Sequence, residues 1–386
     1  MKRRLSVLFL VIMLFAGVLC GCAQRGRSYE LPETEFEGTD YYQNNSMVNS
    51  SDFLMKIGDK LYTIASGYEV NNLCEISSDG VRIVYTEPMN IGESEIWYGN
   101  TLYVLDDMLC VPQIGYQDSN SRYSDRHVDL ETGTIKEPTK IVLERSGFWY
   151  PCVCNGRLYI HNEKDVFRCD GDNKTTPIIS KSDLPVGNIN DVLFDPFENG
   201  YFGMYISEPY VYYGTTVGKT VYLCRYDCTK GKTVDKVKVA DSVTSNPGLN
   251  NIIADGSDVY CSENATIYHI DLENDTCEAL YTGEDGLRLM FNCGGGKLYL
   301  AENFDQKGVL YELDTQHPTS LRTLVEDSDL EFRSLYLFDD TYVYYNNNLE
   351  SVLCRVRISD GKTEKVLDYR KYEDVQKAET TDTNPM

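Results

Sequence analysis

The chain has 386 residues, of which 42% are hydrophobic and 25% charged, and its formal net charge at pH 7 is −24. Nucleic acid is therefore a poor partner, because phosphate binding needs a basic surface that releases counterions. The same negative charge would repel the chain from an anionic membrane surface, so direct adsorption to lipid is not expected.

The first residues have the order of an export signal. Three basic residues follow Met1, and an apolar run extends from Leu5 to Leu19. This run is too short to span a bilayer as a helix, so a secretory signal is the better interpretation. At its end the residues LCGC, 19–22, resemble the bacterial lipobox. The resemblance implies cleavage before Cys22 and a diacylglyceryl thioether on its sulfur, with palmitate-type chains. An ordinary secretory signal with two incidental cysteines is the alternative.

This resemblance also predicts the organisation and the location of the chain. Residues 1–21 would be the signal peptide, and residues 22–50 a flexible, acidic tether. The lipid on Cys22 would hold the protein at the extracytoplasmic face of the cell membrane, since each buried methylene contributes about 0.8 kcal/mol. Residues 372–386 lack any hydrophobic period and are expected to be a disordered tail.

A short phrase recurs between the tether and the tail. It consists of a turn residue, an apolar residue and a tyrosine, and it ends at Tyr62, Tyr103, Tyr159, Tyr212, Tyr260, Tyr299 and Tyr344. A second phrase with a charged residue at its centre follows each copy, and an apolar strand closes each unit. The pattern indicates about four short strands per unit and no helical period.

Seven such units predict an all-β fold, a seven-bladed β-propeller of four-stranded antiparallel blades over residues 51–371. The periodicity resembles that of WD-repeat, YVTN-type and quinoprotein-like propellers, although the WD dipeptide is missing. A pair of β-sandwich domains fits the strand content but does not explain seven similar units.

The cysteines and histidines follow the same repeat. Cys74, Cys224 and Cys354 stand where other units carry Phe or Tyr, which favours packing between blades over metal ligation. His269 stands in the charged position of the second phrase, which favours a structural role. Eleven cysteines would remain after removal of Cys20 and lipidation of Cys22, and their disulfide pairing is left open.

The usual catalytic patterns are missing from the sequence. It contains no H-E-x-x-H, G-x-S-x-G, P-loop or G-x-G-x-x-G pattern. We therefore name no catalytic residue, no metal ligand and no cofactor. With 60 acidic residues, some carboxylate pair will lie near the spacing used by glycosidases by chance alone, so such a pair would not identify an enzyme.

Departures from the repeat point to a binding surface. The second phrase starts 7 to 11 residues after the tyrosine in six units but 24 residues after Tyr103. The excess lies in residues 106–126, with Tyr116 and Tyr123 among amides and acids. A second unusual segment, residues 191–210, is rich in aromatic residues and includes Tyr201 and Phe202. These four side chains are the candidate ligand contacts, on the face that carries the links between blades. They could instead pack the insertions against the ring.

The sequence thus favours a membrane-anchored binding propeller over an enzyme, with an envelope component, glycan or protein as partner. Two alternatives remain at this stage. One is an exported propeller enzyme, a carboxylate-based hydrolase or lyase that acts on glycans. The other is an assembly factor for envelope proteins.

Overall fold

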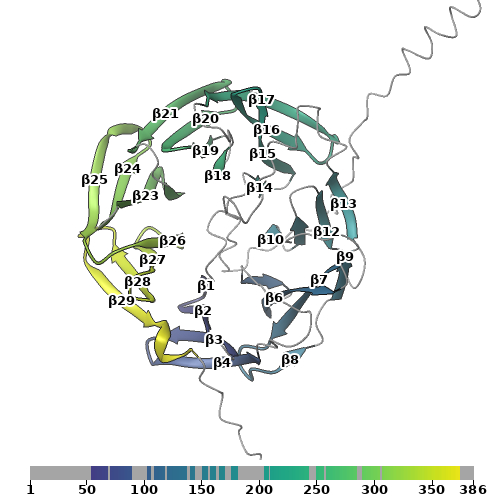
Figure 1. Cartoon of the computed structure of the whole chain (residues 1–386), viewed down its shortest axis with the longest axis vertical. Helices are drawn as coiled ribbons and strands as arrows, with labels where there is room; N and C mark the ends of the chain where they lie inside the picture. The colour runs from purple at the N-terminus through teal and green to yellow at the C-terminus, as the bar shows by residue number, and fades with distance from the viewer. Residues whose placement is uncertain are drawn as a thin grey trace, which may run out of the picture.

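The structure is a computed structural model of the whole chain, and its strands follow one another around a ring (Figure 1). The residues that it describes are 54–67, 70–88, 102–105, 108–117, 120–136, 140–143, 150–154, 157–161, 165–169, 175–180, 204–207, 209–242, 249–255, 258–284, 289–304 and 307–373. We number the sheets 1 to 7 in chain order.

The first three sheets occupy the first half of the ring. Sheet 1 contains β1 (Leu54–Ile57), β2 (Lys60–Ser66), β3 (Val70–Ser77) and β4 (Gly80–Pro88). Sheet 2 contains β5 (Tyr103–Leu105), β6 (Met108–Gln117), β7 (Asn120–Val128), β8 (Ile135–Lys136) and β9 (Lys140–Leu143). Sheet 3 contains β10 (Tyr150–Cys154), β11 (Arg157–His161), β12 (Asp165–Cys169) and β13 (Thr175–Ser180).

Four further sheets complete the ring. Sheet 4 contains β14 (Met204–Ser207), β15 (Tyr210–Val217), β16 (Thr220–Asp227) and β17 (Lys232–Asp241). Sheet 5 contains β18 (Asn250–Asp255), β19 (Asp258–Glu263), β20 (Thr266–Asp271) and β21 (Thr276–Thr282). Sheet 6 contains β22 (Met290–Gly294), β23 (Lys297–Phe304), β24 (Lys307–Asp314) and β25 (His317–Asp327). Sheet 7 contains β26 (Phe332–Leu337), β27 (Tyr342–Asn347), β28 (Val352–Arg357) and β29 (Thr363–Asp368), and the 3₁₀ helix η3 (Tyr369–Lys371) follows it.

The all-β propeller of four-stranded antiparallel blades is confirmed, but the expected number of such blades is wrong. Six sheets have four antiparallel strands in sequence order, whereas sheet 2 has five. In sheet 2 the long strand β7 has two partners on its outer side, because β8 pairs with its last residues and β9 pairs with residues 121–124. The structure therefore has six regular blades, not seven.

The repeat alignment was also wrong in this sheet. Tyr103 lies in the first strand, β5, opposite Cys110. Cys110 in β6 takes the place that tyrosine holds in the second strand of the other sheets, and it faces His127 across the ladder. The residue spacings around it become 48 and 49 in place of 41 and 56. The insertion in this sheet is therefore shorter than expected. The spacing from the second-strand residue to its partner on the third strand is 17 positions for Cys110 and His127, against 13 for Tyr62 and Glu75.

The register explains why the second phrase carries a charge at its centre. In the third strand this charged residue lies opposite the repeated tyrosine, and in the fourth strand a residue of opposite charge lies beside it. The pairs on the third and fourth strands are Glu75 with Arg82, Arg225 with Asp235, Glu312 with Arg322, and Arg355 with Glu364. Arg82 and Arg322 also donate to carbonyls of the next sheet, at Leu130 and Ile358. The charged position thus links strands and sheets.

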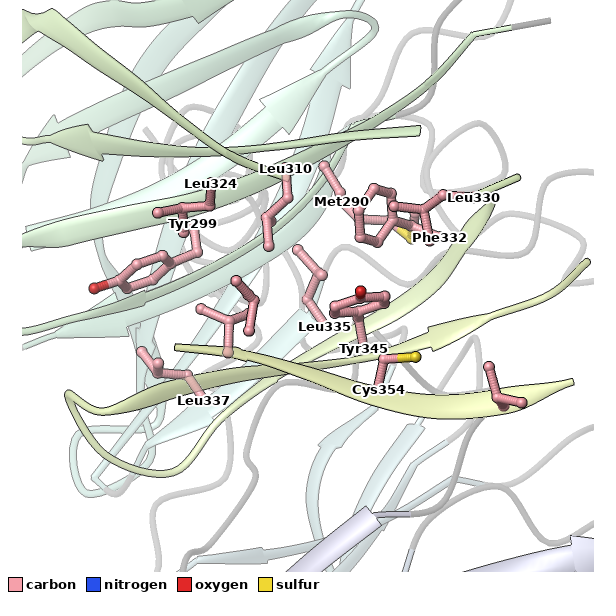
Figure 2. Close-up of a cluster of buried hydrophobic side chains, with 14 residues drawn as sticks. Met290, Tyr299, Leu310, Leu324, Leu330, Phe332, Leu335, Leu337, Tyr345 and Cys354 are labelled. Carbon is pink, nitrogen blue, oxygen red and sulfur yellow. The ribbon is translucent and has the colours of Figure 1, made fainter. Parts of the chain in front are cut away.

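Apolar side chains fill the space between neighbouring sheets. Between sheets 6 and 7, Tyr299, Leu310 and Leu324 face Leu335 and Leu337 (Figure 2). Fourteen buried residues belong to this cluster, which makes it the largest described apolar interface between sheets. A single sheet cannot bury both of its apolar faces, so stacking in a ring is what removes them from water.

The ring closes between sheets 7 and 1 without exchange of a strand, because each of these sheets is built from consecutive strands. Six buried residues pack across this junction: Leu54, Leu61, Tyr336, Tyr344, Leu353 and Leu367. The Lys56 ammonium lies 2.6 Å from a carboxylate oxygen of Asp339, which adds an ion pair. Polar contacts after β29 complete the closure and are described with the site.

The cysteines pack as the repeat predicts. Cys74, Cys224 and Cys354 are buried, with exposed fractions of 0%, 0% and 4%. Burial raises the pKa of the Cys74 thiol to about 12 and that of Cys224 to about 11. Such thiols are poor nucleophiles at neutral pH. Cys74, Cys224, Cys261, Cys277 and Cys354 are free thiols.

Candidate functional site

One face of the ring carries both the turns and the links between sheets. Strands alternate in direction within each sheet, so the turn from the second to the third strand lies on the same side as the connection to the next sheet. We call this side the B–C face. Loops on one face of a rigid propeller are the usual place for binding residues.

A polar pocket lies on the B–C face where the ring closes. Its volume is about 160 Å³. Its walls come from sheet 1, sheet 7 and the segment after β29. The lining residues are Ile64, Ser66, Arg333, Asn346, Asn347, Asn348, Ser351, Val352, Tyr369 and Glu373. The two ends of the folded chain therefore meet at this pocket, and we call it the closure pocket.

Tyr369 fixes one wall of the closure pocket. Its hydroxyl donates to Asn346 Oδ1 at 3.0 Å and lies 3.1 Å from Thr63 Oγ1 on β2, from which it can accept. Asn346 in turn donates to Ser334 Oγ at 3.1 Å. The hydroxyl is therefore engaged on both sides, and Tyr369 is one of the residues that line the pocket.

The amide side chains of the next turn are used for structure. Asn347 Nδ2 donates to the Asp329 carbonyl at 3.0 Å, and its Oδ1 accepts from the backbone N–H groups of Glu331 and Leu349. Ser351 closes the turn with a φ of 53°, a left-handed conformation that few non-glycine residues adopt. This wall of the pocket is therefore formed before any ligand binds.

The solvent side of the pocket carries hydroxyls and opposite charges. Ser66 is exposed at the end of β2, and Arg333 is exposed on β26, the inner strand of sheet 7. Glu373 contributes a carboxylate from the segment that follows η3. Hydroxyl, guanidinium, carboxylate and aromatic groups together can hold a polar ligand by hydrogen bonds and by contact with a ring face.

A buried acid lies between sheets 5 and 6. Glu302 on β23 is only 2% exposed, and its Oε1 has no hydrogen-bond partner among the described residues. Burial raises the pKa of Glu302, although a hydrogen bond from the Tyr281 hydroxyl opposes part of the shift. A Cβ added at Gly283 would clash with Oε1, so the Glu302 carboxylate would have to move. Because Glu302 is shielded from solvent, it forms part of an interface between sheets and is not an accessible acid.

His269 occupies a repeat position, as expected. Its Nε2 lies 2.6 Å from Asp258, its Nδ1 lies 3.3 Å from Glu278, and its ring stacks on Tyr260. The register places it opposite Tyr260 and Glu278, which matches the charged positions of the other sheets. These contacts support the structural interpretation of this histidine.

The residues predicted as ligand contacts are only partly placed. Tyr116 lies in β6 opposite Ser121, and Tyr123 lies in β7 opposite Ile114, so both belong to one antiparallel hairpin that leads to the B–C face. Tyr201, Phe202 and the lipidation site Cys22 lie outside the described residues. The structure does not test these four contacts or the anchor.

The sequence analysis missed the closure pocket, which the structure assembles from three separate regions. Its residues come from the first sheet, the last sheet and the segment after the last strand. The run YYNNN at 344–348 was the available signal, because three amides in succession end a strand and begin a turn. Nothing in the sequence placed this turn beside Ser66.

Within the part of the chain whose structure is described, no group of three or more His, Cys, Asp or Glu side chains has an arrangement that could hold a metal ion. The same residues include no helix with the length and apolar character needed to cross a membrane.

The arrangement of sheets defines the chain as a β-propeller, and comparison with solved structures agrees. A puromycin-hydrolyzing peptidase from Mycobacterium tuberculosis is 12% identical, with a TM-score of 0.55 over 90% of this chain and 57% of that one. Prolyl endopeptidases are 11% identical, with a TM-score of 0.53 over 83% of this chain and 50% of the other. A putative 6-phosphogluconolactonase from Bacteroides uniformis is 12% identical, with a TM-score of 0.51 over 80% of this chain and 96% of that one.

These similarities concern the fold alone, because the identities are very low. The chain spans only about half the length of the peptidases that it resembles. No protein-family model and no curated protein matches the sequence. The class of the protein is thus a propeller whose particular family is not assigned.

Proposed function

We propose that the chain is a lipid-anchored, extracytoplasmic binding protein whose propeller recognises a component of the cell envelope at its B–C face. The closure pocket is the observation that carries this proposal. It lies on the B–C face, on walls that hydrogen bonds hold in place, and it presents hydroxyls, charges and an aromatic ring. Small polar ligands are bound by pockets of this composition.

The anchor is supported by the sequence alone. The basic start, the short apolar run and the residues LCGC precede a polar stretch that would separate the propeller from the membrane. The net charge of −24 would repel the protein from an anionic membrane surface. A diacylglyceryl group on Cys22 would hold it there in spite of this repulsion. The predicted contacts Tyr116, Tyr123, Tyr201 and Phe202 would extend the binding surface around the ring.

The anchor can be tested by changing Cys22 to Ala and separating the membrane and soluble fractions of cells that express the full chain. We expect the wild-type protein in the membrane fraction with a covalent lipid detectable by mass spectrometry, and the variant without that lipid. A matched Cys20→Ala variant should behave as wild type. An acylated, membrane-bound Cys22→Ala protein would contradict the proposed anchor.

An exported enzyme is a second candidate, because several of the similar structures are enzymes. The peptidases and the putative lactonase share the propeller fold with this chain. Among the described residues, the acid with the raised pKa is Glu302, and it is buried between two sheets. Turnover of envelope glycans by the purified protein, lost when a carboxylate at the closure pocket such as Glu373 is changed to Gln, would favour this alternative over binding alone.

A further inference from the structure

We propose that the closure pocket binds one hydroxyl-rich unit of about monosaccharide size, and that this ligand stabilises the closed ring by contacting both of its ends. The inference rests on the proposed binding function and names the ligand class and its effect on the protein. Three observations carry it: the size of the pocket, the groups that line it, and its position across the junction between sheets 7 and 1.

The size of the pocket limits the ligand. A volume of about 160 Å³ is below the range of roughly 300–1,000 Å³ that is typical for drug-sized ligands. It is still large enough for more than a few waters, because one water needs only about 10–15 Å³ on the same measure. A single sugar unit, free or at the end of a chain, fits between these limits.

The lining groups favour hydroxyls over apolar surface. Ser66, Ser351 and Asn348 can exchange hydrogen bonds with hydroxyl groups, while Arg333 and Glu373 add a charged donor and a charged acceptor. Tyr369 also lines the pocket, and the ring of a tyrosine can pack against the apolar face of a sugar. An apolar ligand would displace water from these polar groups without forming hydrogen bonds in its place, which costs free energy.

The pocket lies across the junction at which the ring closes. Sheet 1 contributes Ser66, and sheet 7 contributes Asn348 and Ser351. The segment from Tyr369 to Glu373 lies between them. We call this segment the latch, because Asn72 of sheet 1 donates to the Tyr372 carbonyl at 2.7 Å and Tyr369 joins Thr63 to Asn346.

Occupancy of the pocket by a ligand and closure of the ring are therefore linked. A ligand that contacts both ends binds the closed ring better than an open one, and it must shift the equilibrium toward the closed form. Conversely, removal of the latch lowers the fraction of protein in the closed form and takes away the lining residues Tyr369 and Glu373, so it must weaken binding. The linkage can be measured from either side.

The experiment uses the full-length protein in detergent and free monosaccharides as probes: glucose, N-acetylglucosamine and glucuronate. Binding is measured by calorimetry and by the shift of the thermal midpoint. Ser66→Trp fills the pocket with a large side chain. Val217→Trp is the matched control, because Val217 is also exposed at the end of the second strand of its sheet, in sheet 4.

We expect at least one probe to raise the midpoint of the wild-type and Val217→Trp proteins by about 2–5 °C at saturation, and to leave Ser66→Trp unchanged. Truncation after Asp368, which removes the latch, should weaken binding at least fivefold, a coupling at the lower end of the usual range of about 5- to 150-fold. Truncation after Glu373 keeps the latch and should bind as wild type. Hydrogen exchange should show protection by the ligand in β2 and β27 and none in β15.

Different failures have different meanings. Equal binding of a probe to the wild-type and Ser66→Trp proteins would show that the probe does not bind in the closure pocket. Unchanged affinity after truncation at Asp368 would overturn the linkage between binding and closure. If no monosaccharide binds but an envelope peptide binds wild type and not Ser66→Trp, the ligand class is wrong and the binding function stands. If neither sugars nor envelope fractions bind, both this inference and the proposed binding function are wrong.

Discussion

Two junctions of the ring differ in what holds them together. Between sheets 6 and 7, fourteen buried residues form a continuous apolar cluster (Figure 2). Between sheets 7 and 1, six buried residues pack together, and an ion pair and the hydrogen bonds of the latch complete the contact. The first junction joins neighbours in sequence, whereas the second joins the two ends of the folded chain.

The two junctions differ in the interactions that stabilise them. Burial of apolar surface is the larger stabilising contribution at the junction between sheets 6 and 7. At the closing junction, six buried and seven partly buried hydrophobic residues pack together, and the hydrogen bonds of the latch add about 0.5–1.5 kcal/mol each. A polar pocket at the closing junction is consistent with this, since a site that opens to solvent cannot also be a dry apolar contact.

The largest expected effect is a cavity at the inner junction. Leu335 is fully buried between sheets 6 and 7, so Leu335→Ala should lower the free energy of unfolding by about 2–5 kcal/mol. The matched change Leu353→Ala, at the closing junction, should cost less because its surroundings can adjust. Urea denaturation of both variants measures the difference. An equal or larger loss for Leu353→Ala would show that the two junctions are alike.

Removal of the latch should have an intermediate effect. Truncation after Asp368 deletes the contacts of Tyr369 and Tyr372 with sheet 1, and we expect a loss of roughly 2–4 kcal/mol for about three hydrogen bonds. Faster hydrogen exchange should be confined to β1, β2 and β26 to β28. The protein truncated after Glu373 is the control. Uniformly faster exchange around the ring would mean that the closing junction does not open by itself.

The smallest expected effect concerns a polar group at an inner junction. The pKa of Glu302 is raised by burial, so the folded protein prefers the protonated form. The stabilising contribution of that form is present below the ordinary pKa of a glutamic acid and is lost as the pH rises through the raised value. Glu302→Gln should therefore gain stability relative to wild type as the pH increases from about 4.5 to 8, by on the order of 1 kcal/mol.

Thermal unfolding across this pH range measures the difference between the two proteins. The free energy of unfolding of each protein is expressed relative to its own value at low pH, so that the pH-independent effect of the substitution cancels. A difference that shrinks as the pH rises would contradict the assignment of a protonated Glu302.

The strand repeat could be predicted from the sequence because every unit is local. Turn residues, the tyrosine and the charged centre recur within about 40 to 50 residues, which is the span of one blade. The alignment failed in sheet 2 for a physical reason. Cys110 replaces the tyrosine there, and the similar phrase that ends at Tyr103 belongs to the preceding strand. A phrase match selects the wrong strand when the second strand lacks the tyrosine and the first strand carries one.

The closure pocket could not be predicted in the same way. Ser66 and Ser351 line one pocket although they are far apart in the sequence, and only the closed ring brings them together. The latch residues also resemble an ordinary polar tail, because their role depends on backbone contacts such as that of the Tyr372 carbonyl. The predicted contacts Tyr116 and Tyr123 share a hairpin, and their role in binding stays a prediction.

The absence of strand exchange between sheets 7 and 1 has a consequence for how the protein is made. Each four-stranded blade finds all of its strand partners within its own stretch of chain, so its strands can pair before the rest of the chain has folded. The pairing of Lys56 with Asp339 spans 283 residues and must wait for nearly the whole chain. The last event of folding would then bring the ends together, and a compound that binds between them would favour that final step.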